Sequence, residues 1–208
     1  GMALPGNALV PATMRDLTEY SRKAGKQVVR LAKAGITPSM IMTKEAFRNA
    51  IVVHSAIGGS TNALIHLPAI AKELGIELDP ELFNEINRKI PHIGNVNPSG
   101  KHLTESFWFA GGIPMVQVML KDHLDLDVLT VTGKTLGENL EEIQRDGFFE
   151  RNIGYLHNYG LEREDVITPV ETTKEMGSIA VLKGNLAPEG AVVKYSACEE
   201  SMRKHQGK

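Results

Sequence analysis

Apolar and polar positions alternate with helical spacing over most of the first 143 residues. Apolar side chains return every three or four positions between charged ones, which is the pattern of amphipathic helices. Glycines at 35, 58–59 and 75 follow three of these segments and mark helix ends. The pattern predicts helices over residues 13–33, 44–57, 62–74, 80–89 and 134–143, and over 102–123 in two parts broken by Gly111, Gly112 and Pro114.

The same pattern makes finer predictions. Apolar residues on most sides of segment 62–74 predict a buried helix. Short strands are expected near residue 92 and over 129–131, with a polar loop up to Lys101. Residues 144–165 are polar and irregular, and we expect them to be a linker. His54 and His66 lie within apolar helices and are expected to be hydrogen-bonded core residues.

The pattern changes near the C-terminus. Residues 179–182 and 191–195 are two short apolar runs rich in β-forming residues, separated by Gly184-Asn185 and Pro188-Glu189-Gly190. These runs predict strands. We therefore expect an α/β protein with a helix-rich α/β domain over residues 1–165 and the start of a β domain over residues 166–208.

Composition excludes several classes of function. The net charge is −2 and Lys and Arg are not gathered as a nucleic-acid footprint would require. No apolar run approaches the roughly 18 residues of a membrane span, and no secretion signal is recognisable. One cysteine, Cys198, excludes a disulfide framework and a multi-cysteine metal site within these residues. We expect a cytoplasmic protein that binds neither nucleic acid nor membrane.

One motif suggests anion binding. Gly58 and Gly59 allow a close backbone approach, and Ser60, Thr61 and Asn62 follow at the start of a predicted helix, whose free N–H groups favour a carboxylate or phosphate. An ordinary capped turn is the commoner interpretation of such a sequence. Lys101, in a Pro-Ser-Gly-Lys turn with Ser99, could also hold an anion. Neither this turn nor the run at 131–135 has the spacing of a nucleotide P-loop.

Taken together, several runs resemble the dihydroxy-acid dehydratase and phosphogluconate dehydratase family. They occur in the family's order across nearly the whole chain, and the ordered set is specific although each run alone is weak. The runs are GMALPGN at 1–7, TKEAF at 43–47, GGSTN at 58–62, PSGK at 98–101, AGGIP at 110–114, LTVTGKT at 129–135, ENL at 138–140 and LKGNLAP at 182–188.

The resemblance implies dehydration of a 2,3-dihydroxy carboxylic acid or sugar acid to a 2-keto acid. Family members use an iron–sulfur cluster and Mg²⁺ and take the C2 proton with a serine, and the parent enzyme is expected to be a homodimer or homotetramer. The family's cluster cysteines, its Mg²⁺-site lysine and its catalytic serine fall outside this sequence, and Cys198 matches none of its ligands. We therefore expect these 208 residues to be an internal, inactive part of a longer enzyme, with no cofactor bound, no metal ligands and no catalytic residues.

The resemblance also refines the fold and the site. It implies that residues 166–208 are the first strands of a truncated β-barrel of the swivelling type, so the two runs should pair with another copy, pack back on the helices or be poorly ordered. It favours Ser60, Thr61 and Asn62 as wall residues of the substrate pocket, followed by Ser99 and Lys101. A non-catalytic binding or assembly module that reuses the dehydratase scaffold remains the alternative.

Overall fold

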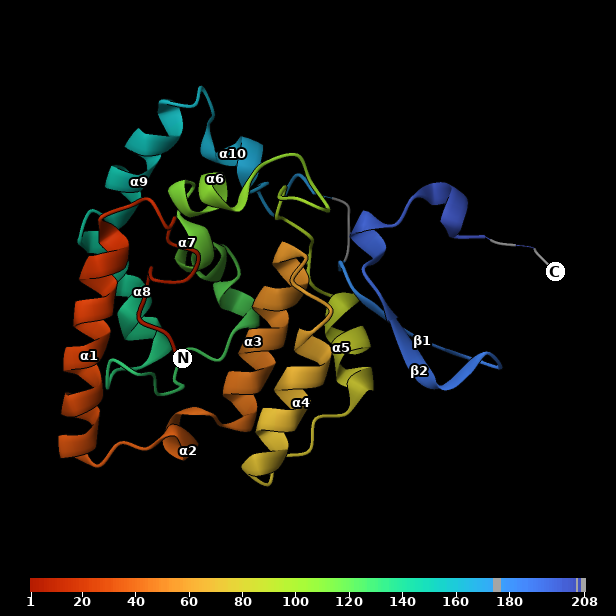
Figure 1. The fold of residues 1–208 in the computed structure, drawn as a ribbon, viewed down its shortest axis with the longest axis horizontal. Helices are drawn as coiled ribbons and strands as arrows, with labels where there is room; N and C mark the ends of the chain where they lie inside the picture. Colours follow the sequence, from red (N-terminus) through yellow and green to blue (C-terminus); the bar gives the residue numbers. More distant parts are fainter. Residues whose placement is uncertain (174–176, 205, 207–208) are drawn as a thin grey trace.

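The computed structural model describes residues 1–173, 177–204 and 206. Helices form the body, and a β-hairpin projects from it beside α5 (Figure 1). The elements are α1 Asp16–Ala34, α2 Pro38–Ile41, α3 Lys44–Ile57, α4 Ala63–Glu73, α5 Pro80–Asn87, α6 Thr104–Phe109, α7 Gly112–Met119, α8 Leu136–Arg145, α9 Phe148–His157, α10 Arg163–Val166, β1 Ala180–Gly184 and β2 Ala187–Val193, with single 3₁₀ turns at Lys121–His123, Tyr195–Ala197 and Glu200–Met202. No helix of the described residues is long and apolar enough to cross a membrane.

Helix α3 is the centre of the body, and its predicted bounds of 44–57 are confirmed. It begins at Thr43, whose hydroxyl accepts a hydrogen bond from Ala46 N–H at 3.3 Å, and it ends at Gly58 in a left-handed conformation. Ile51, Val52 and Ala56 are fully buried. The helix packs against α5 on one side and α7 on another, so its C-terminal end is held firmly where the candidate site begins.

Trp108 organises the other half of the core. Its ring meets Phe109 and Phe148 edge to face, and its Nε1–H donates to the carbonyl of Gly6 at 2.8 Å. Burying this large ring together with its N–H satisfied favours a single packed arrangement. The bond also attaches the N-terminal segment to the core formed by α6, α7, α8 and α9.

The prediction of a linker over residues 144–165 is wrong. Helices α9 and α10 occupy this stretch, and Phe148, Phe149, Leu156 and Val166 are buried in the main core. The charged residues of α9, Glu150 and Arg151, are exposed, while its apolar residues form a stripe with helical spacing that faces the core.

Helix α4 is not buried as predicted. Ala71 is the one buried residue that its span contributes, and Ile65 is 70% exposed. The helix lies on the surface beside α3 and α5, so its apolar residues face outward as well as inward (Figure 1). His66 is accordingly exposed, which corrects its assignment to the core, whereas His54 is buried as expected.

Two further details differ from the sequence-based expectations. Helix α7 begins at Gly112 and accommodates Pro114 in its first turn, so only Ala110 and Gly111, the latter with φ 111°, separate it from α6. The expected strands near residue 92 and over 129–131 are isolated bridges, which pair Gly94 with Ile167 and Leu129 with Thr135. Each bridge joins one residue pair and does not extend into a ladder.

The C-terminal hairpin confirms the two predicted strands but shifts the second one: β2 begins at Ala187, so Pro188-Glu189-Gly190, expected between the strands, lies within it. β1 and β2 pair antiparallel, with Val181 opposite Val192 and Leu182 opposite Ala191. β1 packs back on α5, which was one of the three arrangements expected. A two-stranded sheet does not test the barrel, so the barrel and the division of the chain at residue 165 stay predictions. We call residues 177–204 the C-terminal arm.

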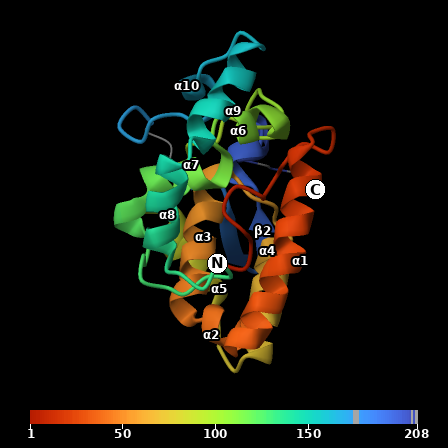
Figure 2. The ribbon, with the colours of Figure 1, turned by 90° about the vertical axis from the view of Figure 1, so that its left-hand side faces the viewer.

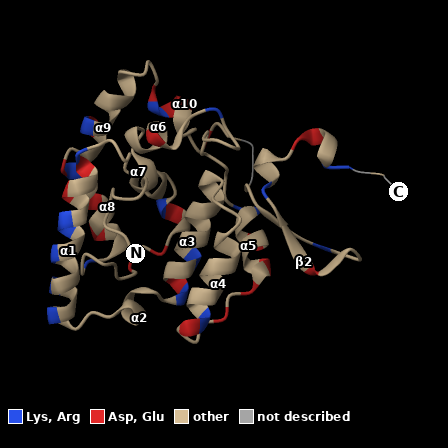
Figure 3. Ribbon diagram, in the orientation of Figure 1, with Lys and Arg blue, Asp and Glu red and all other residues tan. Residues whose placement is uncertain are grey.

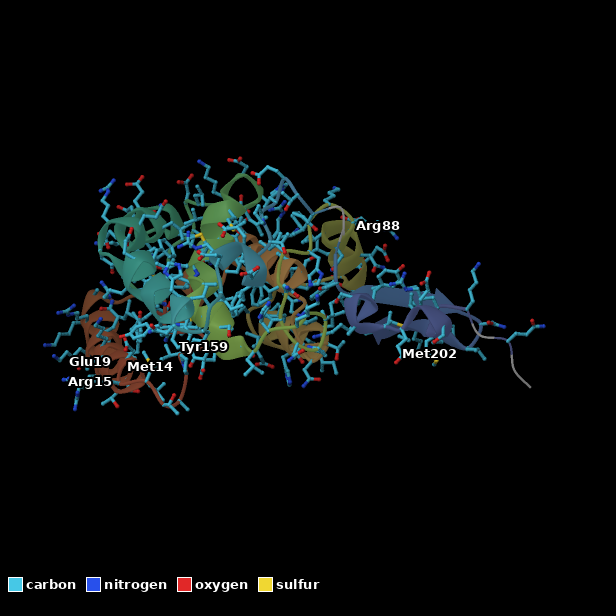
Figure 4. The ribbon with its side chains drawn as sticks, turned by 90° about the horizontal axis from the view of Figure 1, so that it is seen from above. Met14, Arg15, Glu19, Arg88, Tyr159 and Met202 are labelled. Atoms are coloured by element: carbon cyan, nitrogen blue, oxygen red, sulfur yellow. The ribbon has the colours of Figure 1, made fainter. Side chains whose placement is uncertain are left out.

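Helix α1 contrasts with the rest of the body. It runs along one side of the molecule (Figure 2), and none of its residues is buried. Lys and Arg recur along its length (Figure 3), and Glu19 lies near Arg15 and Arg22. Seen from above, Arg15 and Glu19 lie at one end of the molecule and Met202 of the arm at the other (Figure 4).

Candidate functional site

The predicted residues Ser60, Thr61 and Asn62 form the turn between α3 and α4. Gly58 takes φ 64°, which turns the chain after α3, and the N–H of Gly59 donates to the His54 carbonyl at 2.9 Å. A side chain on Gly59 would collide with the His54 ring, because a β-carbon there would lie 2.1 Å from its Cδ2. The two glycines therefore allow this turn to fold back over α3.

The backbone donors at the start of α4 are largely used within the turn itself. The N–H groups of residues 63, 64 and 65 donate to the carbonyls of residues 60, 61 and 62, at 3.1, 3.1 and 3.0 Å. Asn62 N–H faces the Ser60 hydroxyl at 3.3 Å. An anion at this turn would consequently depend on side chains more than on the helix end. Asn62 makes no capping bond, so its amide is free for such a role among the described contacts.

Ser99 lies close to this turn, although it comes from a different loop. A β-carbon on Gly58 would lie 3.2 Å from Ser99 Oγ. Gly100 permits the tight loop, since a β-carbon there would lie 2.3 Å from the Asn95 carbonyl carbon. The structure thus places Ser99 close to Gly58, at the start of the turn, and the assignment of Ser99, Ser60, Thr61 and Asn62 to a pocket wall stays a prediction.

Lys101 is placed differently. Its backbone N–H donates to Asn95 Oδ1 at 3.0 Å and fixes the loop, while its side chain is exposed. In the described parts of the chain, that side chain makes no hydrogen bond or ion pair. Its assignment to the pocket wall therefore stays a prediction.

The C-terminal arm adds two residues that sequence reasoning missed. Lys194 Nζ donates to the Gly58 carbonyl at 2.8 Å, and the Ser196 hydroxyl lies 2.7 Å from that of Ser99. No local pattern could have revealed them, because they come from a separate segment about a hundred positions further along the chain. The candidate site thus combines three segments: the turn, the Ser99 loop and the arm.

His54 lies beneath the turn and is held neutral. Burial lowers its pKa, and the charge of Lys194 acts in the same direction, while the hydrogen bond to Ser60 partly opposes them. Its Nε2 lies 2.8 Å from the Ser60 carbonyl. A carbonyl only accepts, so Nε2 carries the proton and Nδ1 has a bare lone pair. That Nδ1 is buried and has no hydrogen-bond partner among the described residues.

Two asparagines of α5 attach the arm to the body. Asn87 Oδ1 accepts hydrogen bonds from Ser178 N–H, Ile179 N–H and the Ser55 hydroxyl, at 3.0, 3.1 and 2.9 Å. Asn84 bonds both the N–H and the carbonyl of Val181. These side chains act as substitutes for a neighbouring strand and hold the start of β1 in place.

The described residues do not provide a metal centre. No group of three or more His, Cys, Asp or Glu side chains that could hold a metal ion occurs in the part of the chain that the structure describes. Cys198 is a free, partly exposed thiol. The hydroxyl, amide and ammonium groups around Gly58 are suited to binding a small polar anion.

Two grooves border α1, away from these residues. An apolar groove of about 360 Å³ lies between α1, α2 and the N-terminal segment, where Val28, Leu31 and Ile41 contribute to its wall. A polar groove of about 420 Å³ lies between α1 and α8. None of the predicted site residues lines either groove.

Comparison with known proteins agrees with the motifs. The family model described as the dihydroxy-acid/6-phosphogluconate dehydratase N-terminal domain matches residues 1–139, and the corresponding C-terminal model matches residues 165–208. Relatives named dihydroxy-acid dehydratase include those of Halothermothrix orenii (44% identical over 210 residues), Acetivibrio thermocellus (43% over 209) and Methanothermobacter thermautotrophicus (40% over 209). Each comparison covers all of this chain and 35% of the relative. The expected resemblance is confirmed: the chain belongs to the dihydroxy-acid/6-phosphogluconate dehydratase family.

Proposed function

We propose that this chain is part of a hydro-lyase that dehydrates a 2,3-dihydroxy carboxylic acid or sugar acid to a 2-keto acid. The observation that carries the proposal is the similarity to dihydroxy-acid dehydratases along the entire chain, at 40–44% identity in the relatives named above. Because the chain spans 35% of their length, we propose the activity for a longer protein and expect these 208 residues to be inactive alone.

The chain's contribution in this proposal is a wall of the substrate pocket. Ser60, Thr61 and Asn62 follow Gly58 in its turn, and Ser99 Oγ lies close to Gly58 from another loop. In the proposal, their hydroxyl and amide groups hydrogen-bond the carboxylate and hydroxyls of such an acid. Lys101 is the fifth proposed wall residue. Substrate-positioning groups of this kind raise the rate by holding the reacting atoms in place.

The iron–sulfur cluster and Mg²⁺ that the resemblance implies do not fit the described residues. A cluster needs several thiolates and the chain has one cysteine, and no group of three metal-ligating side chains occurs in the described part of the chain. In the proposal, the ligands of the cluster and of Mg²⁺ and the catalytic serine come from other parts of the longer protein, which acts in the cytoplasm as a homodimer or homotetramer.

The test is anaerobic expression of the longer gene product, with the 208-residue chain as the matched control. The purified protein is assayed for 2-keto acid formation from a panel of 2,3-dihydroxy acids and sugar acids, and its mass in solution is measured by light scattering. We expect turnover of at least one acid by the longer protein and none by the chain. Failure on the whole panel would leave the non-catalytic assembly module as the better description.

The pocket wall has its own test in that protein. Thr61→Ala and Asn62→Ala are expected to raise KM by about tenfold, the effect of losing one substrate hydrogen bond, while the unfolding midpoint stays unchanged. Thr172→Ala, at an exposed turn outside the site, serves as the control. Equal KM values in all four proteins would remove these residues from the pocket.

A further inference from the structure

Lys194 has no ion pair with a carboxylate among residues 1–173, 177–204 and 206. Its Nζ is held 2.8 Å from the Gly58 carbonyl, and burial is the cause of its lowered pKa. An ammonium has three N–H donors, so the bond to Gly58 leaves two of them for another acceptor. Partial burial lowers the pKa of Lys194, which means that an anion beside it would restore the solvation that the charge has lost.

Two hydroxyl groups lie beside Gly58, the residue that Lys194 holds, together with the rings of His54 and His92. Ser99 Oγ and Ser196 Oγ lie 2.7 Å apart, and Ser99 is also the residue nearest Gly58 in its loop. A hydroxyl donates or accepts as required, so the pair can turn a donor toward an anion or an acceptor toward an alcohol. One cation with two hydroxyls matches a carboxylate that has a hydroxyl on the neighbouring carbon.

The position of Lys194 is built into the fold and is not that of a loose surface chain. Asn87 and Asn84 hold residues 178–181 at one end of the hairpin, and the Ser178 hydroxyl donates to the Ser55 carbonyl at 2.9 Å. The Ser196 N–H and hydroxyl both point to the Ser178 carbonyl, at 3.3 and 3.4 Å. The ends of the hairpin are thus tied to each other and to α3, with Lys194 directly above Gly58.

We propose that Lys194 binds the carboxylate of the substrate, with the Ser99 and Ser196 hydroxyls on the adjacent C2 hydroxyl, and that Asn84 and Asn87 are its positioning residues. The inference rests on the proposed function for its ligand, a 2,3-dihydroxy acid, and adds the group that recognises the acid. On substrate binding, the ammonium keeps the Gly58 carbonyl and adds a charge-assisted bond to the carboxylate, which is stronger than a bond between neutral groups.

The discriminating variant is Lys194→Gln in the longer protein. Glutamine keeps an N–H donor for the Gly58 carbonyl but has no charge, so the arm stays attached while the carboxylate loses its partner. Lys194→Arg keeps the charge, and Lys183→Met removes an exposed lysine of β1 as the control. Circular dichroism and the protection of the Val181 amide from hydrogen exchange confirm that each variant is folded with its arm in place.

The readout is equilibrium dialysis of radiolabelled 2-hydroxybutanoate, which has no C3 hydroxyl to lose and is therefore not turned over, and of its neutral amide. We expect Lys194→Gln to raise the Kd of the acid at least about tenfold and to leave that of the amide unchanged, with Lys194→Arg close to wild type and Lys183→Met equal to it. Equal Kd values of the acid for wild type and Lys194→Gln, or no binding by wild type, would overturn the role of Lys194. A protein that binds the acid through Lys194 but forms no 2-keto acid from the panel of 2,3-dihydroxy acids and sugar acids would instead contradict the proposed function.

Discussion

Asn84 and Val181 exchange two hydrogen bonds: Val181 N–H donates to Asn84 Oδ1 at 2.8 Å, and Asn84 Nδ2–H donates to the Val181 carbonyl at 2.9 Å. This is the exchange that two residues of adjacent antiparallel strands make, performed here by one side-chain amide on a helix. The pair is buried, so neither backbone group of Val181 has water as a substitute.

Asn84→Ala should therefore release the arm. We expect a loss of about 1–3 kcal/mol in the free energy that holds β1 against α5, because a buried donor and acceptor lose their partner. Hydrogen exchange at the Val181 amide should accelerate at least tenfold, an amount that corresponds to about 1.4 kcal/mol. The matched control is Asn158→Ala at an exposed position after α9, which should leave that rate unchanged. An unaltered Val181 rate in Asn84→Ala would show that the remaining contacts of the arm, those of Asn87 among them, hold it without Asn84.

Thr135 is a structural residue at the end of the run 131–135, which lacks the spacing of a P-loop. Its hydroxyl accepts from Glu138 N–H at 3.2 Å, and the Glu138 carboxylate accepts from Thr135 N–H at 2.7 Å, which closes a capping box at the start of α8. Thr135→Ala should lower the free energy of unfolding by about 1 kcal/mol in urea titrations. Thr61 caps no helix, so Thr61→Ala should change the free energy of unfolding by less than about 0.5 kcal/mol. A larger loss of stability in Thr61→Ala than in Thr135→Ala would contradict the assignment of Thr135 as a cap and of Thr61 as a site residue.

Acid should destabilise the protein through His54. Burial lowers its pKa in the folded state, so the unfolded chain binds more protons over the range just below the ordinary histidine value. This contribution is fully present above the unfolded pKa of about 6.5 and is lost as the pH falls toward the lower folded value. Urea midpoints measured from pH 7.5 to pH 5.0 should fall.

The variant His54→Gln separates this histidine from the others. It should flatten the fall between pH 7 and pH 5, whatever its effect on stability at pH 7.5, because glutamine does not titrate. His66→Gln alters an exposed histidine of α4 and should keep the wild-type slope. Identical slopes in all three proteins would assign the acid sensitivity to other groups.

Trp108→Phe should loosen the N-terminal segment. Phenylalanine retains most of the ring but leaves the Gly6 carbonyl without its donor, and the smaller ring leaves space against Phe148. We expect the free energy of unfolding to fall by about 2 kcal/mol. Unfolding monitored by circular dichroism measures this loss. Faster proteolysis within residues 1–12 should accompany it. Phe109→Leu, which leaves the Trp108–Gly6 bond intact, should spare that segment.

The helices that were predicted well from the sequence are those whose ends are marked by local signals. Thr43 and Gly58 mark the two ends of α3 by capping and by left-handed backbone, and both signals are independent of the rest of the fold. The failure at α9 is of another kind. Phe148, Asn152 and Leu156 have helical spacing, but the charged and polar residues between them give the segment the composition of a linker. The predicted burial of α4 is too high because the apolar content of a helix does not show which of its faces another element covers.

The candidate site was half predictable. The Gly58–Asn62 motif and Ser99 were found because glycine and short polar residues mark close-packed turns. Their meeting with Lys194 and Ser196 is a tertiary event between segments with a hundred residues between them, and it depends on Asn84 and Asn87, which read from sequence as ordinary polar positions of a helix.

The way the arm is attached has a consequence for heating. Val181 and Ile179 are its buried apolar residues, while most of its ties are amide, hydroxyl and ammonium bonds, and Leu186 at its tip is 97% exposed. Moderate warming weakens the packing of apolar side chains less than it weakens such hydrogen bonds. A warmed sample should pass through a state in which the strands have peeled away from a still-intact helical bundle, and calorimetry would then record two steps in place of one.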